Sequence, residues 1–251
     1  MKVYVLPFGT VEVDVQKFMA WEPFRGERYS GPASGFLIQT DDGINVLVDT
    51  GLSPEHVKNP EARAAAPDVV VMMAPEDDVR HRLAELGVKP DDIAYVVQTH
   101  FDFDHCGGNR FFPNATFVVQ REHYEYAKQH PERFPAQDWD IPELGYQLID
   151  GDQELLPGIE LLTTPGHAPG HQSVVVRGLA NTGTIILSAD AAHTHIEFEE
   201  ELVAGTPEDD DLLASIHKLK RIRDAEHATL ITCHDVDAWN DEYRISPAYY
   251  D

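Results

Sequence analysis

Short apolar runs recur along the chain, and turn-forming residues separate them. Runs of roughly four to eight residues that are rich in Val, Ile and Thr predict β-strands. The pattern predicts strands at residues 2–8, 11–15, 36–40, 44–49, 93–99, 116–120, 159–163, 173–176, 184–188 and 229–232.

Two segments instead show apolar residues at helical spacing. Residues 76–86 place Val79 and Leu83 on one face, and a glycine follows as a stop signal. Farther on, Thr206 and Pro207 are typical of a helix cap and a first helical turn. The apolar positions of that second helix are Leu212, Leu213, Ile216, Leu219 and Ile222. Strands interleaved with amphipathic helices predict an α/β layered fold, and the lack of repeats and linkers predicts one domain over 1–251.

Ligand-type side chains follow four of the predicted strands. His100, His167, Asp190 and His234 each stand within a few residues of a strand's end. Because ligand sites of α/β folds form at the carboxyl ends of strands, we expect these side chains to converge.

The densest chemistry lies in the segment 99–108. Two imidazoles and two carboxylates, those of His100, Asp102, Asp104 and His105, occupy positions 100–105, and a glycine pair follows. Imidazole and carboxylate are preferred ligands of zinc and iron, and glycines let the backbone turn tightly beside a metal. The alternative is a polar loop that satisfies its own hydrogen bonds. The density of ligands favours the metal site.

Composition excludes some partners. The chain has 19 Lys and Arg against 44 Asp and Glu, a formal net charge of −25, which repels nucleic acids and anionic membranes. It contains no apolar run of about 18 residues, and its start reads as a strand, so we expect a cytoplasmic protein. Two cysteines, Cys106 and Cys233, are too few for a disulfide framework. The acidic runs indicate a solvated surface or, alternatively, a salt-rich cytoplasm.

The motifs resemble those of the metallo-β-lactamase superfamily. The similarity rests on His100-x-Asp102-x-Asp104-His105, on His167 within Thr-Pro-Gly-His-Ala-Pro-Gly-His, on Asp190 and on His234. Within the superfamily the chain is most similar to the N-acyl homoserine lactonases, the quorum-quenching enzymes. The stretches 102–109, 119–122 and 164–173 support that assignment.

The resemblance implies an αββα sandwich, two mixed sheets flanked by helices, with two divalent metal ions in the cleft between the sheets. It implies that His100, Asp102 and His167 hold one metal, that Asp104, His105 and His234 hold the other, and that Asp190 bridges both. Asp49 and His171 then support the ligands without coordinating. The remaining histidines are most simply surface residues: His56, His81, His123, His130, His217 and His227.

Two positions depart from the family pattern. Asp102 stands where the family usually has histidine, and His193 stands where the lactonases usually have tyrosine. With three aspartates and a bridging hydroxide, two divalent metals give a neutral site, which favours a neutral substrate. Zinc is the expected metal, while the extra oxygen ligand shifts preference toward manganese or ferrous iron. Alternatively, Asp102 reaches its metal through water or not at all.

The resemblance thus implies a lactonase that opens the ring of N-acyl homoserine lactones through a metal-bridging hydroxide. Asp104 is the candidate proton donor to the leaving alkoxide. His193 is either a hydrogen-bond donor to the carbonyl oxygen or a surface residue, and Phe103 either walls the substrate pocket or packs in the core. The apolar residues of 16–25, Phe18, Met19, Trp21 and Phe24, either line an acyl-chain groove or pack in the core.

Other functions remain open at this point. The same metal pair would serve another ester, lactone or thioester hydrolase. Asp102 alone suggests a di-iron redox protein, although the chain has no second domain for flavin. A metal-binding protein without turnover is the third alternative. We expect a small-molecule substrate, no nucleic-acid or membrane partner, and a monomer or homodimer.

Overall fold

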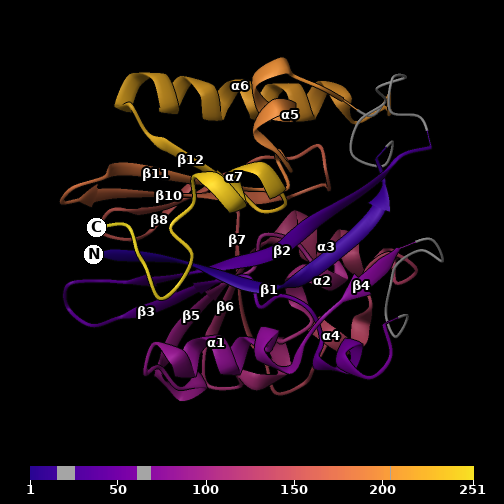
Figure 1. The fold of residues 1–251 in the computed structure, drawn as a ribbon, viewed down its shortest axis with the longest axis vertical. Helices are drawn as coiled ribbons and strands as arrows, with labels where there is room; N and C mark the ends of the chain where they lie inside the picture. Colours follow the sequence, from indigo (N-terminus) through magenta and orange to yellow (C-terminus); the bar gives the residue numbers. More distant parts are fainter. Residues whose placement is uncertain (16–25, 61–68, 204) are drawn as a thin grey trace.

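Two β-sheets lie face to face in the computed structural model, which describes residues 1–15, 26–60, 69–203 and 205–251 (Figure 1). The first sheet has the order β4-β1-β2-β3-β5-β6-β7, and the second has the order β12-β11-β10-β9-β8. The strands of the first sheet are β1 (Lys2–Asp14), β2 (Arg28–Gln39), β3 (Asn45–Val48), β4 (Val70–Met72), β5 (Ile93–Val97), β6 (Thr116–Gln120) and β7 (Gly145–Ile149). Those of the second are β8 (Gln153–Leu156), β9 (Ile159–Thr163), β10 (Gln172–Leu179), β11 (Gly183–Ala189) and β12 (Thr229–Thr232).

Both sheets are mixed. In the first, β4, β1, β2 and β3 pair antiparallel, and β3, β5, β6 and β7 run parallel. In the second, only the β11–β12 pair is parallel. The parallel pairs in both sheets place several strand ends, and the loops after them, at a common rim.

Helices cover the outer faces of the two sheets, with α6 at one end of the view in Figure 1 and α1 at the other. This is the αββα sandwich that the resemblance implied. The helices are α1 (Val79–Glu85), α2 (Phe103–Cys106), α3 (Arg121–Gln129), α4 (Ala136–Trp139), α5 (His195–Glu200), α6 (Asp209–Glu226) and α7 (Val236–Asp241). Short 3₁₀ helices span Pro54–Val57, Pro75–Asp77, Pro90–Asp92 and Asn109–Phe111. Within the described residues, no helix is long and apolar enough to cross a membrane.

The alternation of side chains along β10 explains the layers. Val174 and Val176 pack in the core between the sheets, together with Val5 and Phe36 of the first sheet. Val175, between them, faces the other way and packs under α6. Because a strand points successive side chains to opposite faces, a run of valines can serve two apolar layers at once. The second sheet is therefore buried on both sides at β10.

The strands that the pattern missed lie at the edges of the sheets. β4, β7 and β8 are all edge strands, and their side chains are mostly exposed or half-buried, so they carry little apolar periodicity. The predicted strands 2–8 and 11–15 form one strand, β1, whose pairing register shifts between Pro7 and Thr10.

Both predicted helices begin later than expected. The segment 76–86 is interrupted at Asp78, whose extended backbone ends a 3₁₀ turn and whose side chain accepts the amide hydrogen of Arg80, so that α1 starts at Val79. The second helix, α6, starts at Asp209 with Glu208 at its N-cap, not with Thr206. Its buried residues include Leu212, Ile216 and Leu219, as the spacing predicted.

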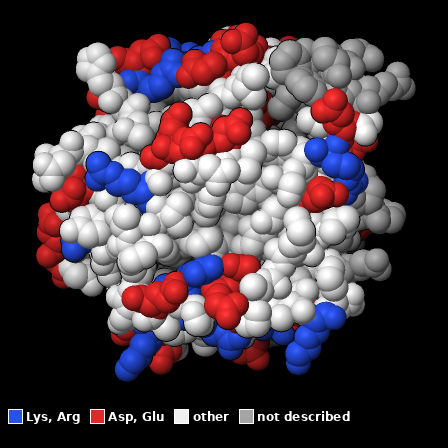
Figure 2. Space-filling view, in the orientation of Figure 1, with Lys and Arg blue, Asp and Glu red and all other residues white. Residues whose placement is uncertain are grey.

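Acidic side chains gather on the helical layer formed by α5 and α6, at the top of the view in Figure 2. Some are paired there: Lys220 contacts Glu201 at 2.8 Å, and Arg223 contacts Glu199. The negative charge is thus a surface property, separate from the buried carboxylates described next.

Candidate metal centre

The loops that follow β5, β9, β11 and β12 meet at one rim and bring the sequence-predicted ligands together. The side chains that converge are those of His100, Asp102, Asp104, His105, His167, Asp190 and His234. Four sets of three have ligand atoms close enough to share a metal ion. The first group is His100, Asp102 and His167, and the second group is Asp104, His105 and His234; the other two sets join Asp190 to His100 and His105 and to His167 and His193.

In the first group, Asp102 lies between two imidazoles. Its Oδ2 is 2.9 Å from Nε2 of His167 and 3.3 Å from Nε2 of His100. Asp102 precedes the single turn of α2 with an extended backbone, and its side chain does not cap that helix. It therefore points at the histidines.

In the second group, Oδ2 of Asp104 is 3.9 Å from Nε2 of His105 and 3.9 Å from Nε2 of His234. Asp104 and His105 are adjacent in α2, and both are buried. His234 comes from the far end of the chain and is held by its Nδ1, which donates to the carbonyl oxygen of Pro32 at 2.8 Å.

Asp190 stands between the two groups and presents a different oxygen to each. Its Oδ1 is 3.4 Å from Nε2 of His105 and 3.3 Å from Nε2 of His234. Its Oδ2 is 3.7 Å from Nε2 of His100 and 3.5 Å from Nε2 of His167. A carboxylate so placed can bridge two cations. Three of the imidazoles, those of His100, His105 and His234, have Nδ1 engaged elsewhere and face Asp190 with Nε2.

Those anchors lie behind the ligands. Asp49 accepts from Nδ1 of His105 at 2.8 Å and from the hydroxyl of Thr99 at 2.7 Å, and that hydroxyl in turn lies 3.0 Å from Nδ1 of His100. With Nδ1 engaged as donor, each imidazole keeps its Nε2 lone pair for a ligand. Burial and the neighbouring His105 hold the pKa of His100 well below its usual range, so that imidazole is neutral.

Three buried atoms of this cluster fit a metal centre. Nε2 of His100, Nε2 of His105 and Oδ1 of Asp190 are buried without a hydrogen-bond partner among the described residues. Buried polar atoms are rarely left unpaired, because burial without a partner is unfavourable. Two imidazole nitrogens and a carboxylate oxygen facing one another match the donors that divalent metals prefer.

His193 is buried against the same centre. Its Nε2 is 3.5 Å from Oδ2 of Asp190, and its Nδ1 is 2.9 Å from Oε2 of Glu197, which is itself buried. Burial alone would lower the pKa of His193, but the carboxylates of Glu197 and Asp190 raise it to about 10. The reading of His193 as a surface residue is wrong, and the side chain is placed as a protonated donor.

Arg133 places a positive charge against the first group of ligands. Its Nε donates to Oδ1 of Asp102 at 3.0 Å, and its Nη2 donates to Oδ2 of the same carboxylate at 2.7 Å. Burial would raise the pKa of Asp102, but Arg133 and the neighbouring imidazoles hold it well below its usual range. Arg133 thus adds a positive charge beside Asp102, outside the sum of two metals, a hydroxide and three aspartates, and the neutrality of that sum stays a prediction.

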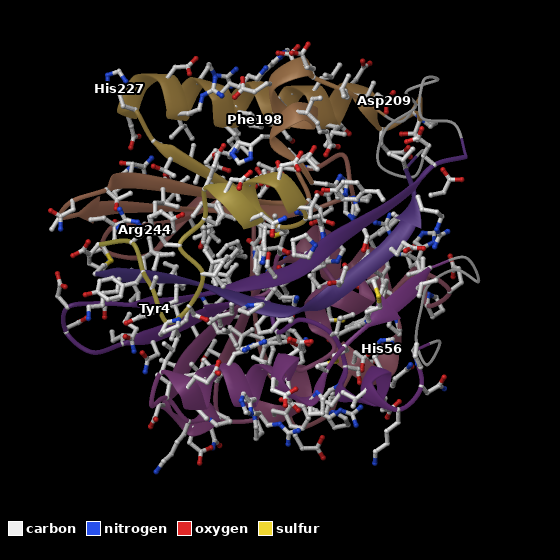
Figure 3. All side chains as sticks on the ribbon, viewed as in Figure 1. Tyr4, His56, Phe198, Asp209, His227 and Arg244 are labelled. Atoms are coloured by element: carbon white, nitrogen blue, oxygen red, sulfur yellow. The ribbon has the colours of Figure 1, made fainter. Side chains whose placement is uncertain are left out.

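Two histidines expected at the surface are buried. His123 accepts the amide hydrogen of Phe101 at Nε2 (2.8 Å) and donates from Nδ1 to the carbonyl oxygen of Pro169 (2.9 Å). His56 packs edge-on against Phe103, inside the molecule, whereas His227 lies at the outer end of α6 (Figure 3). The polar sequence around each histidine concealed its burial.

The loop 164–171, which carries His167, is wedged between two helices. Gly166 has a φ of +129°, and a Cβ on it would meet Cα of Leu212 in α6 at 2.4 Å. Gly170 has a φ of +66°, and a Cβ there would meet the backbone nitrogen of His123 in α3 at 2.4 Å. His171 fastens the loop to the centre, since its Nε2 accepts the amide hydrogen of Asp190 at 3.1 Å.

A cavity of about 360 Å³ opens beside the centre, and Tyr126, Arg133, His167, His193 and Leu212 are among the residues that line it. Phe103 is buried in the apolar cluster that also contains Phe8 and Leu52. The predicted acyl-chain residues of 16–25 lie outside the described residues.

Sequence reasoning did not find Arg133, Glu197 or Gln98. Gln98 donates from Nε2 to Oδ1 of Asp49 at 2.9 Å and to the carbonyl oxygen of His105 at 3.0 Å. None of these residues belongs to a ligand motif, and Arg133 lies 31 positions from its partner Asp102. The acidic Glu197 four residues after His193 was the one local signal.

Comparisons with known proteins agree on one family. The model of the metallo-beta-lactamase superfamily matches residues 28–234. N-acyl homoserine lactonase AiiA of Bacillus thuringiensis subsp. kurstaki is 34% identical, over 99% of this chain and 98% of that protein. N-acyl homoserine lactonase AttM of Rhizobium radiobacter is 35% identical, over 100% of this chain and 98% of that protein.

Solved structures agree as well. An N-acyl homoserine lactone hydrolase with the product N-hexanoyl-L-homoserine bound at its catalytic metal centre superposes with a TM-score of 0.89 at 32% identity, over 99% of this chain and 98% of that chain. The dizinc quorum-quenching lactonase AidC, with a TM-score of 0.69 at 18% identity over 99% of this chain and 93% of that one, shares the fold.

Proposed function

Since this chain belongs to the metallo-beta-lactamase superfamily and, within it, to the family of the N-acyl homoserine lactonases, we propose that it hydrolyses the lactone ring of N-acyl homoserine lactones with two divalent metal ions. The observation that carries the proposal is Asp190, whose two oxygens face two separate groups of imidazole and carboxylate ligands.

The ligands of the two ions follow from the grouping. His100, Asp102 and His167 would hold one, Asp104, His105 and His234 the other, and Asp190 both. Bound there, the ions would supply Lewis acidity and lower the pKa of water toward neutrality. Zinc suits the imidazoles, and the three carboxylates also suit iron or manganese.

His193 would serve as a hydrogen-bond donor to the substrate carbonyl oxygen. Its imidazolium, held by Glu197 at Nδ1, turns Nε2 toward the centre and lines the cavity. Negative charge develops on that oxygen when the carbonyl carbon is attacked, so a fixed positive donor favours the transition state more than the ground state.

Asp104 would return a proton to the ring oxygen when the ester bond breaks. Its carboxylate is buried with no cationic side chain in ion-pair contact among the described residues, apart from the imidazoles of its own group. Hydrolysis adds one water across the ester: the carbonyl carbon gains an oxygen, and the alkoxide oxygen gains a proton.

The test is acid release from homoserine lactones with short and long acyl chains, measured together with the metal content of the same protein. We expect two metals per chain and rapid ring opening, with no turnover by the Asp190→Asn variant. Two bound metals without acid release from any of these lactones would overturn the proposed substrate. Fewer than two metals per chain after reloading at a saturating zinc concentration would overturn the dinuclear centre.

A further inference from the structure

The two proposed metal positions differ in one respect that their ligand sets do not reveal. In the first group, both carboxylate oxygens of Asp102 already accept hydrogen bonds from a cation, the guanidinium of Arg133, at 3.0 and 2.7 Å. Asp104, its counterpart in the second group, has no lysine or arginine within ion-pair distance among the described residues.

Arg133 also faces a second ligand of the first group. Its Nη2 is 3.0 Å from Nε2 of His167, the same nitrogen that lies 2.9 Å from Asp102. A guanidinium has five N–H donors and no acceptor, so Nη2 directs a donor at the nitrogen of His167 that a metal would need. One guanidinium nitrogen, Nη2, therefore contacts two of the three side chains in the first group, Asp102 and His167.

Partial burial strengthens the ion pair between Arg133 and Asp102. The side chain of Asp102 is 14% exposed and that of Arg133 is 34% exposed, so solvent screens the pair only in part. A guanidinium stays protonated at any pH the protein tolerates, and here burial, which would lower its pKa, is outweighed by Asp102, which raises it. The positive charge is permanent.

We propose that Arg133 is a built-in cation that competes with the metal for the position formed by His100, Asp102 and His167. The inference rests on the proposed dinuclear centre and adds the order in which its two metal positions fill. The position formed by Asp104, His105 and His234 fills first and tightly, and the other fills second and weakly, because its metal must displace Nη2 from His167 and share Asp102 with a like charge. At limiting metal the protein then holds one ion per chain.

The experiment is a calorimetric zinc titration of protein stripped by a chelator. Wild-type protein should show two binding events, the weaker with a Kd at least tenfold above that of the stronger. Arg133→Gln should tighten the weaker event at least tenfold and change the stronger by less than about threefold. Arg121→Gln is the matched control: it removes the same charge from an exposed pair with Asp150 and should leave both events unchanged.

Assignment of the events needs two further variants. Asp102→Asn should abolish the weaker event and Asp104→Asn the stronger; the reverse pattern would overturn the order. If Arg133→Gln is unfolded by circular dichroism, Arg133→Lys, which cannot engage both carboxylate oxygens, should still tighten the weaker event at least threefold.

The outcomes separate this inference from the function it rests on. If the Arg133 variants bind two zinc ions with the same ratio of Kd values as the wild type, the proposed competition is overturned and the dinuclear centre still stands. A single binding event in both the wild type and Arg133→Gln would overturn both, whereas one event in the wild type and two in the variant would be the strongest form of competition.

Discussion

Glu197 holds Nδ1 of His193 at 2.9 Å, and neither side chain is open to solvent. This carboxylate fixes the direction of the imidazole and, with Asp190, keeps it protonated. Glu197 engages Nδ1, whereas Nε2 of His193 is the nitrogen that faces the centre, so we regard Glu197 as a positioning residue.

Glu197→Gln should lower kcat about tenfold and leave KM within about threefold. His193 remains but becomes a weaker and less well oriented donor, which costs more in the transition state than in the ground state. His193→Phe should lower kcat by about a hundredfold. Steady-state kinetics on one lactone measure both effects, with Glu199→Gln in the same helix, exposed, as the control. Unchanged turnover in His193→Phe would remove the residue from the reaction.

Removing one carboxylate should disturb both metals. Asp190→Asn keeps the shape of the side chain but loses its charge and one acceptor, and this residue faces four imidazoles. Metal content measured by elemental analysis should fall below one ion per chain at equal zinc. If the variant retains two ions, Asp190 does not bridge them. Asp150→Asn, at an exposed ion pair, serves as the comparison.

The buried His123 predicts an acid-sensitive fold. Burial lowers the pKa of His123 to about 4, whereas the unfolded chain takes up that proton near pH 6.5. Between these values the unfolded state binds more protons than the folded state, so the free energy of unfolding falls as the pH falls. The loss begins near pH 6.5 and reaches about 3 kcal/mol in total as the pH approaches 4.

Urea unfolding of wild type and His123→Gln at pH 7 and pH 4.5 tests this contribution. The variant should be less stable at pH 7, because the carbonyl oxygen of Pro169 loses its donor, and it should lose less stability on acidification. His130→Asn, at an exposed histidine, should keep the wild-type pH dependence. Parallel losses in wild type and His123→Gln would contradict the assignment.

The surface charge predicts a response to salt. A net charge of −25 repels itself, and ions at about 1 M shorten the range of that repulsion to about 3 Å. The melting temperature should therefore rise with KCl concentration. A flat or falling curve would exclude adaptation to a salt-rich cytoplasm.

The ligands could be predicted because each lies just beyond a strand and belongs to a compact motif. His100, His167, Asp190 and His234 are far apart in sequence, yet the ends of β5, β9, β11 and β12 bring them together. Apolar runs predict where strands end, and this allowed the meeting of the four ligand side chains at one rim to be predicted.

The partners of the ligands could not be predicted, since they depend on contacts between layers. Arg133 reaches Asp102 from a turn after α3, and His123 reaches Pro169 from within that helix. Neither residue type is unusual in a polar segment, and nothing in its neighbours indicates burial. Three of the four edge strands, β4, β7 and β8, were missed because most of their side chains are exposed or half-buried, whereas the edge strand β12 is mostly buried and was predicted.

The wedged loop 164–171 sets a rule for redesign of the pocket. Its glycines leave no room for a side chain against Leu212 and His123, so random substitution at Gly166 or Gly170 would shift His167 together with the backbone. Tyr126 and Leu212 line the same cavity but belong to helices that do not carry ligands. A library that varies those two walls and spares the loop would sample new acyl groups while the metal chemistry stays in place.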